Sequence, residues 1–208
     1  MSLDELGLKY QTDKASTCHN YLQYYEMFFS PLKDKVKNLL EIGVWEGASL
    51  KMWKEYFVNA DVVGIDIEDK KQFNSERIRT IICDQSSHSQ LMNLFDLHPS
   101  FDIIIDDGSH IGEHQLISFN TLFPLLKSGG LYCIEDALCN YDPRWNEKVK
   151  IIDRIKEMVG EVQMNGKIPN SFICANKQEA VKKYDATYFE RNIEWLFTSC
   201  GLVIIKKM

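Results

Sequence analysis

The chain has 208 residues, of which 45% are hydrophobic and 26% are charged, ordinary values for one globular domain. Its net charge of −6 argues against a general nucleic-acid binder, because such a protein needs a basic surface to neutralise phosphates. No apolar run reaches the roughly 18 residues of a membrane-spanning helix, so no membrane partner is expected. The six cysteines lack C-x-x-C spacing, which favours free thiols in a reducing, cytoplasmic compartment over a zinc site or disulfides.

Strand-like and helix-like segments alternate along the chain, which is typical of an α/β fold. A polar, aromatic-rich leader comes first, with a helix expected over residues 21–29. Five strands are expected at 36–42, 61–67, 77–82, 101–105 and 131–134, separated by helices at 48–57, 87–95 and 113–126. Gly129 and Gly130 are expected to end the last of these helices. A polar helix over 145–159 and an irregular segment over 160–185 follow.

Two short apolar runs, at 193–198 and 202–206, close the chain. Their connection is too short for a parallel crossover, so the runs are expected to pair antiparallel. The sequence thus predicts a doubly wound α/β fold, with a mainly parallel seven-stranded sheet and an antiparallel C-terminal strand. Residues 36–208 are expected to form a single domain, with leader helices in residues 1–35 packing on it.

Acidic side chains follow two of the expected strands. The sequence D-D-G-S-H occupies residues 106–110, and Glu135 and Asp136 follow the fifth strand. Ligands of open parallel sheets bind at the carboxyl ends of strands. Carboxylates suit a hard cation such as Mg²⁺, and a nearby histidine can act as a general base. The alternative is that these residues are solvated turns or helix caps.

A glycine turn, E-I-G-V-W-E-G at residues 41–47, joins the first expected strand to its helix. Gly43 would allow a ligand to approach the backbone, and Gly47 would allow helix and strand to pack closely. A turn with only a structural role explains the glycines equally well. Asp66 ends the second strand about 20 residues later, where a carboxylate can accept hydrogen bonds from ribose hydroxyls. Asp84 after the third strand could accept one from an adenine amino group, or could be a simple turn residue.

Taken together, this loop and the acidic strand ends resemble the class I S-adenosylmethionine-dependent methyltransferases. The resemblance implies that S-adenosylmethionine is the cofactor. Asp106 is expected to face its sulfonium group or to orient the loop. The full set of expected cofactor contacts is Glu41, Gly43, Val44, Gly47, Asp66, Ile67, Asp84, Gln85 and Asp106.

The D-D-G-S-H sequence, the later Glu-Asp pair and K-Y-Q-T-D-K at residues 9–14 are similar to the metal-dependent sugar O-methyltransferases that modify macrolide antibiotics, of the mycinamicin and macrocin type. The resemblance runs from the leader to the final strand. It implies Asp107, Glu135 and Asp136 as ligands of Mg²⁺ (or Mn²⁺) and His110 as the general base. The D-x-x-H spacing fits one helical turn, which brings positions i and i+3 to the same face.

The expected activity is therefore methyl transfer from S-adenosylmethionine to a hydroxyl of a sugar or glycosylated small molecule. A phenolic, catechol-like acceptor and a non-catalytic cofactor-binding protein of the same fold are the alternatives, and a homodimer stays open. His114 is expected beside the site rather than as a metal ligand. Two departures from the family concern the substrate: the macrolide enzymes carry an extra N-terminal domain for which this chain has no room, and Gln11 stands where relatives often have glycine.

Overall fold

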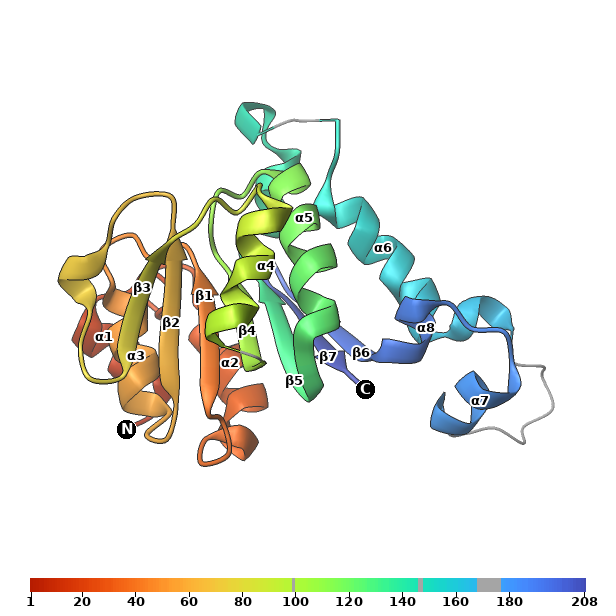
Figure 1. The fold of residues 1–208 in the computed structure, drawn as a ribbon, viewed down its shortest axis with the longest axis horizontal. Coiled ribbons are helices and arrows are strands. Elements are labelled where there is room, and N and C mark those ends of the chain that lie inside the picture. Colours follow the sequence, from red (N-terminus) through yellow and green to blue (C-terminus); the bar gives the residue numbers. More distant parts are fainter. Residues whose placement is uncertain (99, 146–147, 168–176) are drawn as a thin grey trace.

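A seven-stranded sheet organises the chain, and the computed structural model describes it over residues 1–98, 100–145, 148–167 and 177–208 (Figure 1). The strand order is β3-β2-β1-β4-β5-β7-β6. Strands β1 to β5 pair in parallel, whereas β7 is antiparallel to both β5 and β6. The expected fold class is thereby confirmed. The strands span Asn38–Ile42 (β1), Asp61–Asp66 (β2), Ile78–Ile82 (β3), Phe101–Asp106 (β4), Leu126–Ile134 (β5), Ile193–Thr198 (β6) and Val203–Lys207 (β7).

Helices cover both faces of the sheet (Figure 1). Helices α1, α2 and α3 pack on one face, and α4, α5 and α6 pack on the other. The helices of the described residues span Leu3–Tyr10 (α1), Leu22–Phe29 (α2), Ala48–Tyr56 (α3), His88–Leu97 (α4), Gly112–Leu122 (α5), Ile151–Val162 (α6), Lys177–Lys183 (α7) and Tyr188–Asn192 (α8). None of them combines the length and the hydropathy needed to cross a membrane.

Successive strand residues divide between the two cores. Leu39 in β1 and Ile103 in β4 pack toward α1–α3, whereas Leu40 and Ile104 pack toward α4–α6. A strand turns alternate side chains to opposite faces, so burial of both faces requires a nearly continuous apolar sequence. Strand order reverses between β1 and β4, which places a ligand crevice outside the carboxyl ends of these two strands.

The boundary between the fifth helix and fifth strand differs from the prediction. Helix α5 ends at Leu122, because Pro124 follows in a 3₁₀ turn and cannot continue the helix. Strand β5 begins at Leu126, so Gly129 and Gly130 lie inside it rather than at a helix end. A register irregularity of β5 against β4 accommodates them.

Helices α1, α6 and α7 have bounds that the sequence does not predict. A capping box formed by Ser2 and Glu5 starts α1. The helix expected from residue 145 begins instead at Ile151, after a 3₁₀ turn at Pro143–Trp145. The segment expected to be irregular holds the end of α6 and all of α7, while residues 146–147 and 168–176 lie outside the described residues.

Candidate functional site

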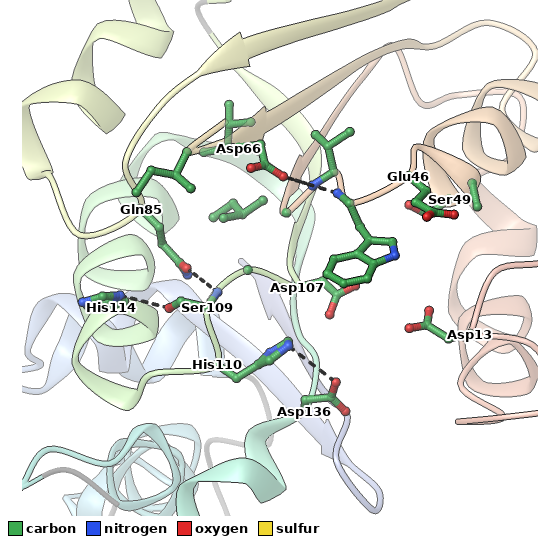
Figure 2. A pocket seen from close by; sticks show the side chains of 18 of the residues that line it. Asp13, Glu46, Ser49, Asp66, Gln85, Asp107, Ser109, His110, His114 and Asp136 are labelled. Carbon is green, nitrogen blue, oxygen red and sulfur yellow. Dashed lines mark hydrogen bonds and ion pairs between the residues drawn. The ribbon is translucent and has the colours of Figure 1, made fainter. Parts of the chain in front are cut away.

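A cavity of about 590 Å³ opens at the carboxyl ends of the parallel strands, within the usual size range for small-molecule sites (Figure 2). Its wall brings together residues from Gln11 to Trp145, which lie 134 positions apart in the sequence. Among the predicted site residues, those lining the cavity are Gly43, Val44, Asp66, Ile67, Asp84, Gln85, Asp107, His110 and Asp136. Four of the predicted site residues do not line the cavity, namely Glu41, Gly47, Asp106 and Glu135. Their placement therefore does not support direct contact with a ligand in the cavity.

The glycine turn directly contacts the loop of residues 106–110 after β4, called the acidic loop below. Gly43 has φ +91°, and a β-carbon built on it would lie 2.1 Å from the carbonyl oxygen of Asp107. The Gly43 N–H donates to the carbonyl of Ile65 at 2.8 Å. Only glycine allows this approach, because a side chain would collide with backbone atoms. Gly47 starts α3 with φ +69°, and a β-carbon there would meet the ring of Phe73.

Asp66, which was predicted to accept hydrogen bonds from ribose hydroxyls, ends β2 and lines the cavity. Its Oδ2 accepts the N–H of Val44 at 2.9 Å and that of Trp45 at 3.3 Å, and its Oδ1 accepts the N–H of Glu68 at 3.0 Å. These bonds fix the carboxylate on the glycine turn. Each carboxylate oxygen accepts about two hydrogen bonds, so acceptor capacity is left for a ligand.

Asp84 and Gln85 have different roles in the structure. Asp84 Oδ1 accepts from the N–H and hydroxyl of Ser86 at 2.8 and 2.7 Å, which lowers the pKa of Asp84. Gln85 joins two loops, since its Nε2 donates to Asp106 Oδ1 at 2.6 Å and its Oε1 accepts the N–H of Ser109 at 3.0 Å. Gln85 therefore orients the acidic loop at the cavity wall.

Asp106 points into the core behind this wall. It is fully buried, and besides Gln85 it accepts the Ser118 hydroxyl at 2.5 Å. Burial raises the pKa of Asp106 to about 6, and the two hydrogen bonds oppose that shift. Of the two expectations for Asp106, this placement supports orientation of the loop and not contact with the sulfonium group.

Three side chains of the acidic loops converge at the cavity. Within the described residues, one ligand atom each from Asp107, His110 and Asp136 lie within 4.8 Å of one another, a grouping that can hold a metal ion. His110 Nε2 lies 3.9 Å from Asp136 Oδ2, and its buried Nδ1 has no hydrogen-bond partner among the described residues. The convergence does not come from a helical turn as predicted, because His110 precedes α5 and has φ +57°.

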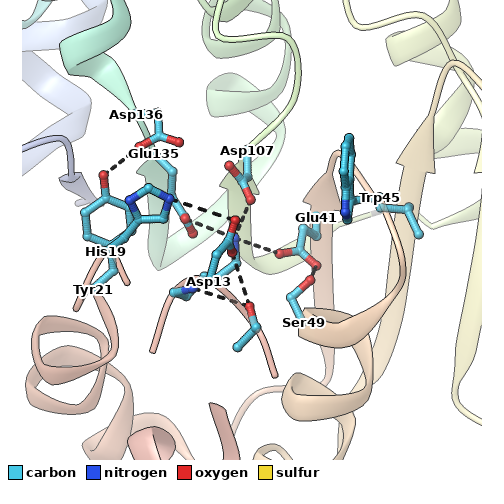
Figure 3. Close-up of polar contacts among 12 residues, drawn as sticks. Asp13, His19, Tyr21, Glu41, Trp45, Ser49, Asp107, Glu135 and Asp136 are labelled. Atoms are coloured by element: carbon cyan, nitrogen blue, oxygen red, sulfur yellow. Dashed lines mark hydrogen bonds and ion pairs between the residues drawn. The ribbon is translucent and has the colours of Figure 1, made fainter. Parts of the chain in front are cut away.

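Glu135 and Glu41 are buried, and both contact the ammonium group of Lys14. Figure 3 shows these two carboxylates together with that of Asp107. Lys14 Nζ lies 2.9 Å from Glu135 Oε2 and 3.6 Å from Glu41 Oε1, and it also contacts Asp107. Burial would lower the pKa of Lys14, but these three carboxylates outweigh burial and raise that pKa well above its usual value. Glu41 also accepts the Ser49 hydroxyl at 2.7 Å.

Two tyrosines of the N-terminal segment donate hydrogen bonds to the carboxylates that follow β5. Tyr21 donates to Asp136 Oδ1 at 2.7 Å, and Tyr25 donates to Glu135 Oε1 at 2.8 Å. Sequence reasoning gave Lys14 no role at the site, although the K-Y-Q-T-D-K similarity was an available signal. It expected most of the leader tyrosines to pack on the sheet and one or two of them to line the substrate cleft. His114 lies beside the cluster as expected, with its Nδ1 3.0 Å from Ser109 Oγ.

Comparisons with known proteins agree with this geometry. A family model described as "Methyltransferase domain" matches residues 40–137. The chain is 42% identical over 145 residues to the 8-demethyl-8-alpha-L-rhamnosyl tetracenomycin-C 2'-O-methyltransferase of Streptomyces olivaceus, covering 66% of this chain and 38% of that protein. It is 40% identical over 148 residues to the demethylmacrocin O-methyltransferase of Streptomyces fradiae, covering 68% and 38% respectively.

A solved structure with the same fold is MycE, a methyltransferase from the mycinamycin biosynthetic pathway in complex with Mg, SAH and mycinamycin VI. Its TM-score is 0.85 at 31% identity, over all of this chain and 54% of MycE. The chain thus spans about two fifths of the length of these curated relatives and about half of MycE. It carries a methyltransferase domain of the Rossmann-like class and is a homologue of the macrolide sugar O-methyltransferases.

Proposed function

We propose that this chain transfers a methyl group from S-adenosylmethionine to a hydroxyl of a sugar or glycosylated small molecule, with Mg²⁺ at the acidic loops. The observation that carries the proposal is the convergence of Asp107, His110 and Asp136 on the same cavity as Gly43 and Asp66. Methyl transfer needs donor and acceptor atoms about 3 Å apart, so both must enter one cavity.

The residues present fit both groups. Asp107 and Asp136 offer carboxylate oxygens, the ligands that Mg²⁺ prefers. The glycine turn and Asp66 offer a close backbone approach and free acceptor capacity for a nucleoside. The bound ion would supply the positive charge that favours ionisation of the acceptor hydroxyl. Glu135 stays a predicted ligand, although both of its oxygens already contact Lys14 and Tyr25.

His110 is the proposed general base. A histidine imidazole can take up a proton near neutral pH and so serve as a general base. Asp136 lies next to it and would stabilise the imidazolium that forms, since an adjacent negative charge favours the protonated ring. Ser109 and His114 hold the loop between Asp107 and α5 in place.

The relatives support a sugar hydroxyl as the acceptor, because one is named as the 2'-O-methyltransferase of a rhamnosyl tetracenomycin and another as an L-olivosyl-oleandolide 3-O-methyltransferase. The proposal includes a cytoplasmic location, which the free thiols of Cys83 and Cys133 suit. A phenolic acceptor is distinguished by assaying simple catechols beside glycosides. A non-catalytic protein would bind cofactor but methylate neither class.

The first test measures cofactor binding. Calorimetry is expected to show one SAH site per chain, and Asp66→Ala should weaken binding by roughly 1–3 kcal/mol, because ligand hydroxyls lose their partner. Asp69→Ala is the matched control, since Asp69 is an exposed acid of the following loop that pairs with Lys71. Absence of SAH binding to the unaltered protein would remove the methyltransferase proposal.

The second test separates the base from the metal residues. His110→Ala should retain SAH and Mn²⁺ binding but lose about 10²–10⁴-fold in turnover of a glycoside acceptor. Asp136→Ala should lose Mn²⁺ affinity together with turnover, and EDTA should abolish turnover until Mg²⁺ is restored. Normal turnover of His110→Ala would mean that another group acts as the base, and His114 would be tested next.

A further inference from the structure

A second cavity, of about 660 Å³, lies outside the candidate functional site. It opens among α1, α3 and residues 72–78, which lead into the edge strand β3 (Figure 1). None of its described wall residues lines the first cavity. A cavity of this volume is large enough for an organic ligand, and the proposed function does not use it.

Three cationic side chains line the second cavity. Lys51 Nζ lies 5.5 Å from the centroid of the Phe73 ring, and Lys54 Nζ donates to Ser75 Oγ at 3.2 Å. Within the described part of the chain, neither lysine forms an ion pair with a carboxylate, and neither does Arg77, the third cation. Unpaired positive charges that line one concave surface attract an anion to it, even in a chain whose net charge is −6.

Arg77 is held by the main chain and keeps donors for a ligand. Its guanidinium donates three hydrogen bonds to carbonyls at and beyond the end of α3, at 2.7 to 3.1 Å, those of Lys54, Phe57 and Ala60. A guanidinium has five N–H donors. Two donors of Arg77 are therefore left without a partner among the described residues.

The acid of this wall does not compete for the three cations. Among the described wall residues, Glu55 is the only acid. Lys9 Nζ lies 2.6 Å from Glu55 Oε2, and the Tyr10 hydroxyl donates to the same oxygen. The carboxylate of Glu55 is thus already paired, and the wall keeps an excess of positive charge.

Two aromatic rings provide the apolar part of the wall. Phe73 is partly buried, and its ring lies so close to Gly47 that a β-carbon there would be 2.7 Å from it. This contact fixes the Phe73 ring against the start of α3. Tyr10 is also partly buried and is fixed by its bond to Glu55. Aromatic rings in fixed positions offer a surface on which a planar group of a ligand packs favourably.

We propose that the second cavity binds a phosphate ester that carries a planar ring, the chemical class to which nucleotides belong. The three cations would bind the phosphate oxygens, and the rings of Phe73 and Tyr10 would pack against the planar group. Phosphate suits this wall better than a carboxylate does, because it carries more than one negative charge and more acceptor oxygens. The inference goes beyond the proposed function and does not depend on it.

The test is a calorimetric titration of the full chain with uridine diphosphate, in the presence of SAH and EDTA. SAH blocks the first cavity, and EDTA removes any metal ion that would draw phosphates to the acidic loops. Uridine diphosphate should bind to one site per chain with a Kd below about 1 mM. Uridine, which lacks the phosphates, should bind at least about tenfold more weakly, and pyrophosphate, which lacks the ring, at least about threefold more weakly.

Variants of the wall locate the bound ligand. Lys51→Met and Lys54→Met should each weaken binding of uridine diphosphate about tenfold, because each removes a charge-assisted hydrogen bond. Neither lysine is buried or ion-paired, so both variants should fold, which thermal unfolding checks. Lys182→Met, which removes the same charge from the exposed face of α7, is the control and should bind within about twofold. Phe73→Leu should weaken binding of uridine diphosphate about threefold and leave binding of pyrophosphate unchanged.

A chain that does not bind uridine diphosphate overturns the inference. Equal binding by the unaltered protein and by a variant that lacks both Lys51 and Lys54 also overturns it, because the ligand then lies elsewhere. Pyrophosphate that binds as tightly as uridine diphosphate would refute the contacts with the rings. If a single-stranded oligothymidylate binds at these lysines and uridine diphosphate does not, the surface belongs to a nucleic acid and the inference is wrong.

Discussion

Replacement of Gly43 by alanine should damage both the stability and the site. A β-carbon at Gly43 would lie 2.1 Å from the Asp107 carbonyl oxygen and 2.8 Å from its carbonyl carbon. The left-handed backbone of Gly43 costs an alanine about 1–2 kcal/mol. Overpacking against backbone that has to move adds about 1–3 kcal/mol. Gly43→Ala should therefore lower the free energy of unfolding by roughly 2–5 kcal/mol, a large part of the usual 5–15 kcal/mol of a domain.

Gly129 offers a matched control for this prediction. It has φ +78°, close to the +91° of Gly43, but a β-carbon there would meet no atom of the described residues within 4 Å. Gly129→Ala should cost only the backbone contribution, about 1–2 kcal/mol. Urea unfolding gives both free energies, and calorimetry should show at least tenfold weaker SAH binding only for Gly43→Ala, because the clash displaces the loop of Asp107. Equal losses of stability, with normal SAH binding by both variants, would refute the close approach as the reason for glycine.

Two further predictions concern buried polar groups. Burial raises the pKa of Asp106 from 3.8 to about 6. Between pH 3.8 and about 6, the folded state therefore keeps a proton that the unfolded state releases. The free energy of unfolding should fall as pH rises through this range. This pH-dependent loss of stability should be up to roughly 3 kcal/mol, and Asp106→Asn should abolish it in urea unfolding measured from pH 4 to 7. If the free energy of unfolding depends on pH in the same way in Asp106→Asn, the shifted pKa is wrong. Tyr25→Phe should cost about 1–3 kcal/mol in urea unfolding, because Glu135 Oε1 loses its donor. Tyr24→Phe is the control, because the Tyr24 ring packs against Phe197. An equal loss of unfolding free energy in both variants would show that the hydrogen bond to Glu135 does not contribute.

The sheet and the acidic loops could be predicted from the sequence because their signals are local. Apolar runs predict the strands, and the short connection between β6 and β7, residues 199–202 in the structure, predicts the antiparallel ending. Asp107 and Asp136 could be predicted because each lies within two residues of the end of such a run. Topology alone then brings the carboxyl ends of β4 and β5 together.

The contacts of the N-terminal segment could not be predicted in this way. Lys14 meets Asp107 across 93 positions and Glu135 across 121, and no periodicity connects residues so far apart. An aromatic and polar leader is compatible with simple packing on the sheet, and most of Tyr25 is used in that way against Phe29 and Trp53. Only its hydroxyl distinguishes a structural tyrosine from one that orients a carboxylate.

His110 shows that a correct grouping can follow from an incorrect geometry. The D-x-x-H spacing predicted one helical turn, yet the loop before α5 is irregular and His110 adopts φ +57°. A non-glycine residue in the left-handed region is uncommon, and such conformations concentrate where the surrounding structure fixes a functional side chain. Asn140 contributes to that fixation, since its Nδ2 donates to the His110 carbonyl at 3.4 Å.

The proposed chemistry depends on how the glycine turn and the acidic loop are held against each other. The turn would bind the methyl donor through Asp66, and the acidic loop would bind the acceptor through Asp107 and His110. β1 and β4 pair directly, with Ile42 opposite Asp106, so the two loops leave adjacent strands at the same level. Gly43 then lets them touch without an intervening side chain. Because methyl transfer requires atoms about 3 Å apart, a shift of one loop past the other by even 1 Å would misplace donor and acceptor. Substitutions at this contact should therefore reduce turnover even where they leave both bound molecules in the cavity.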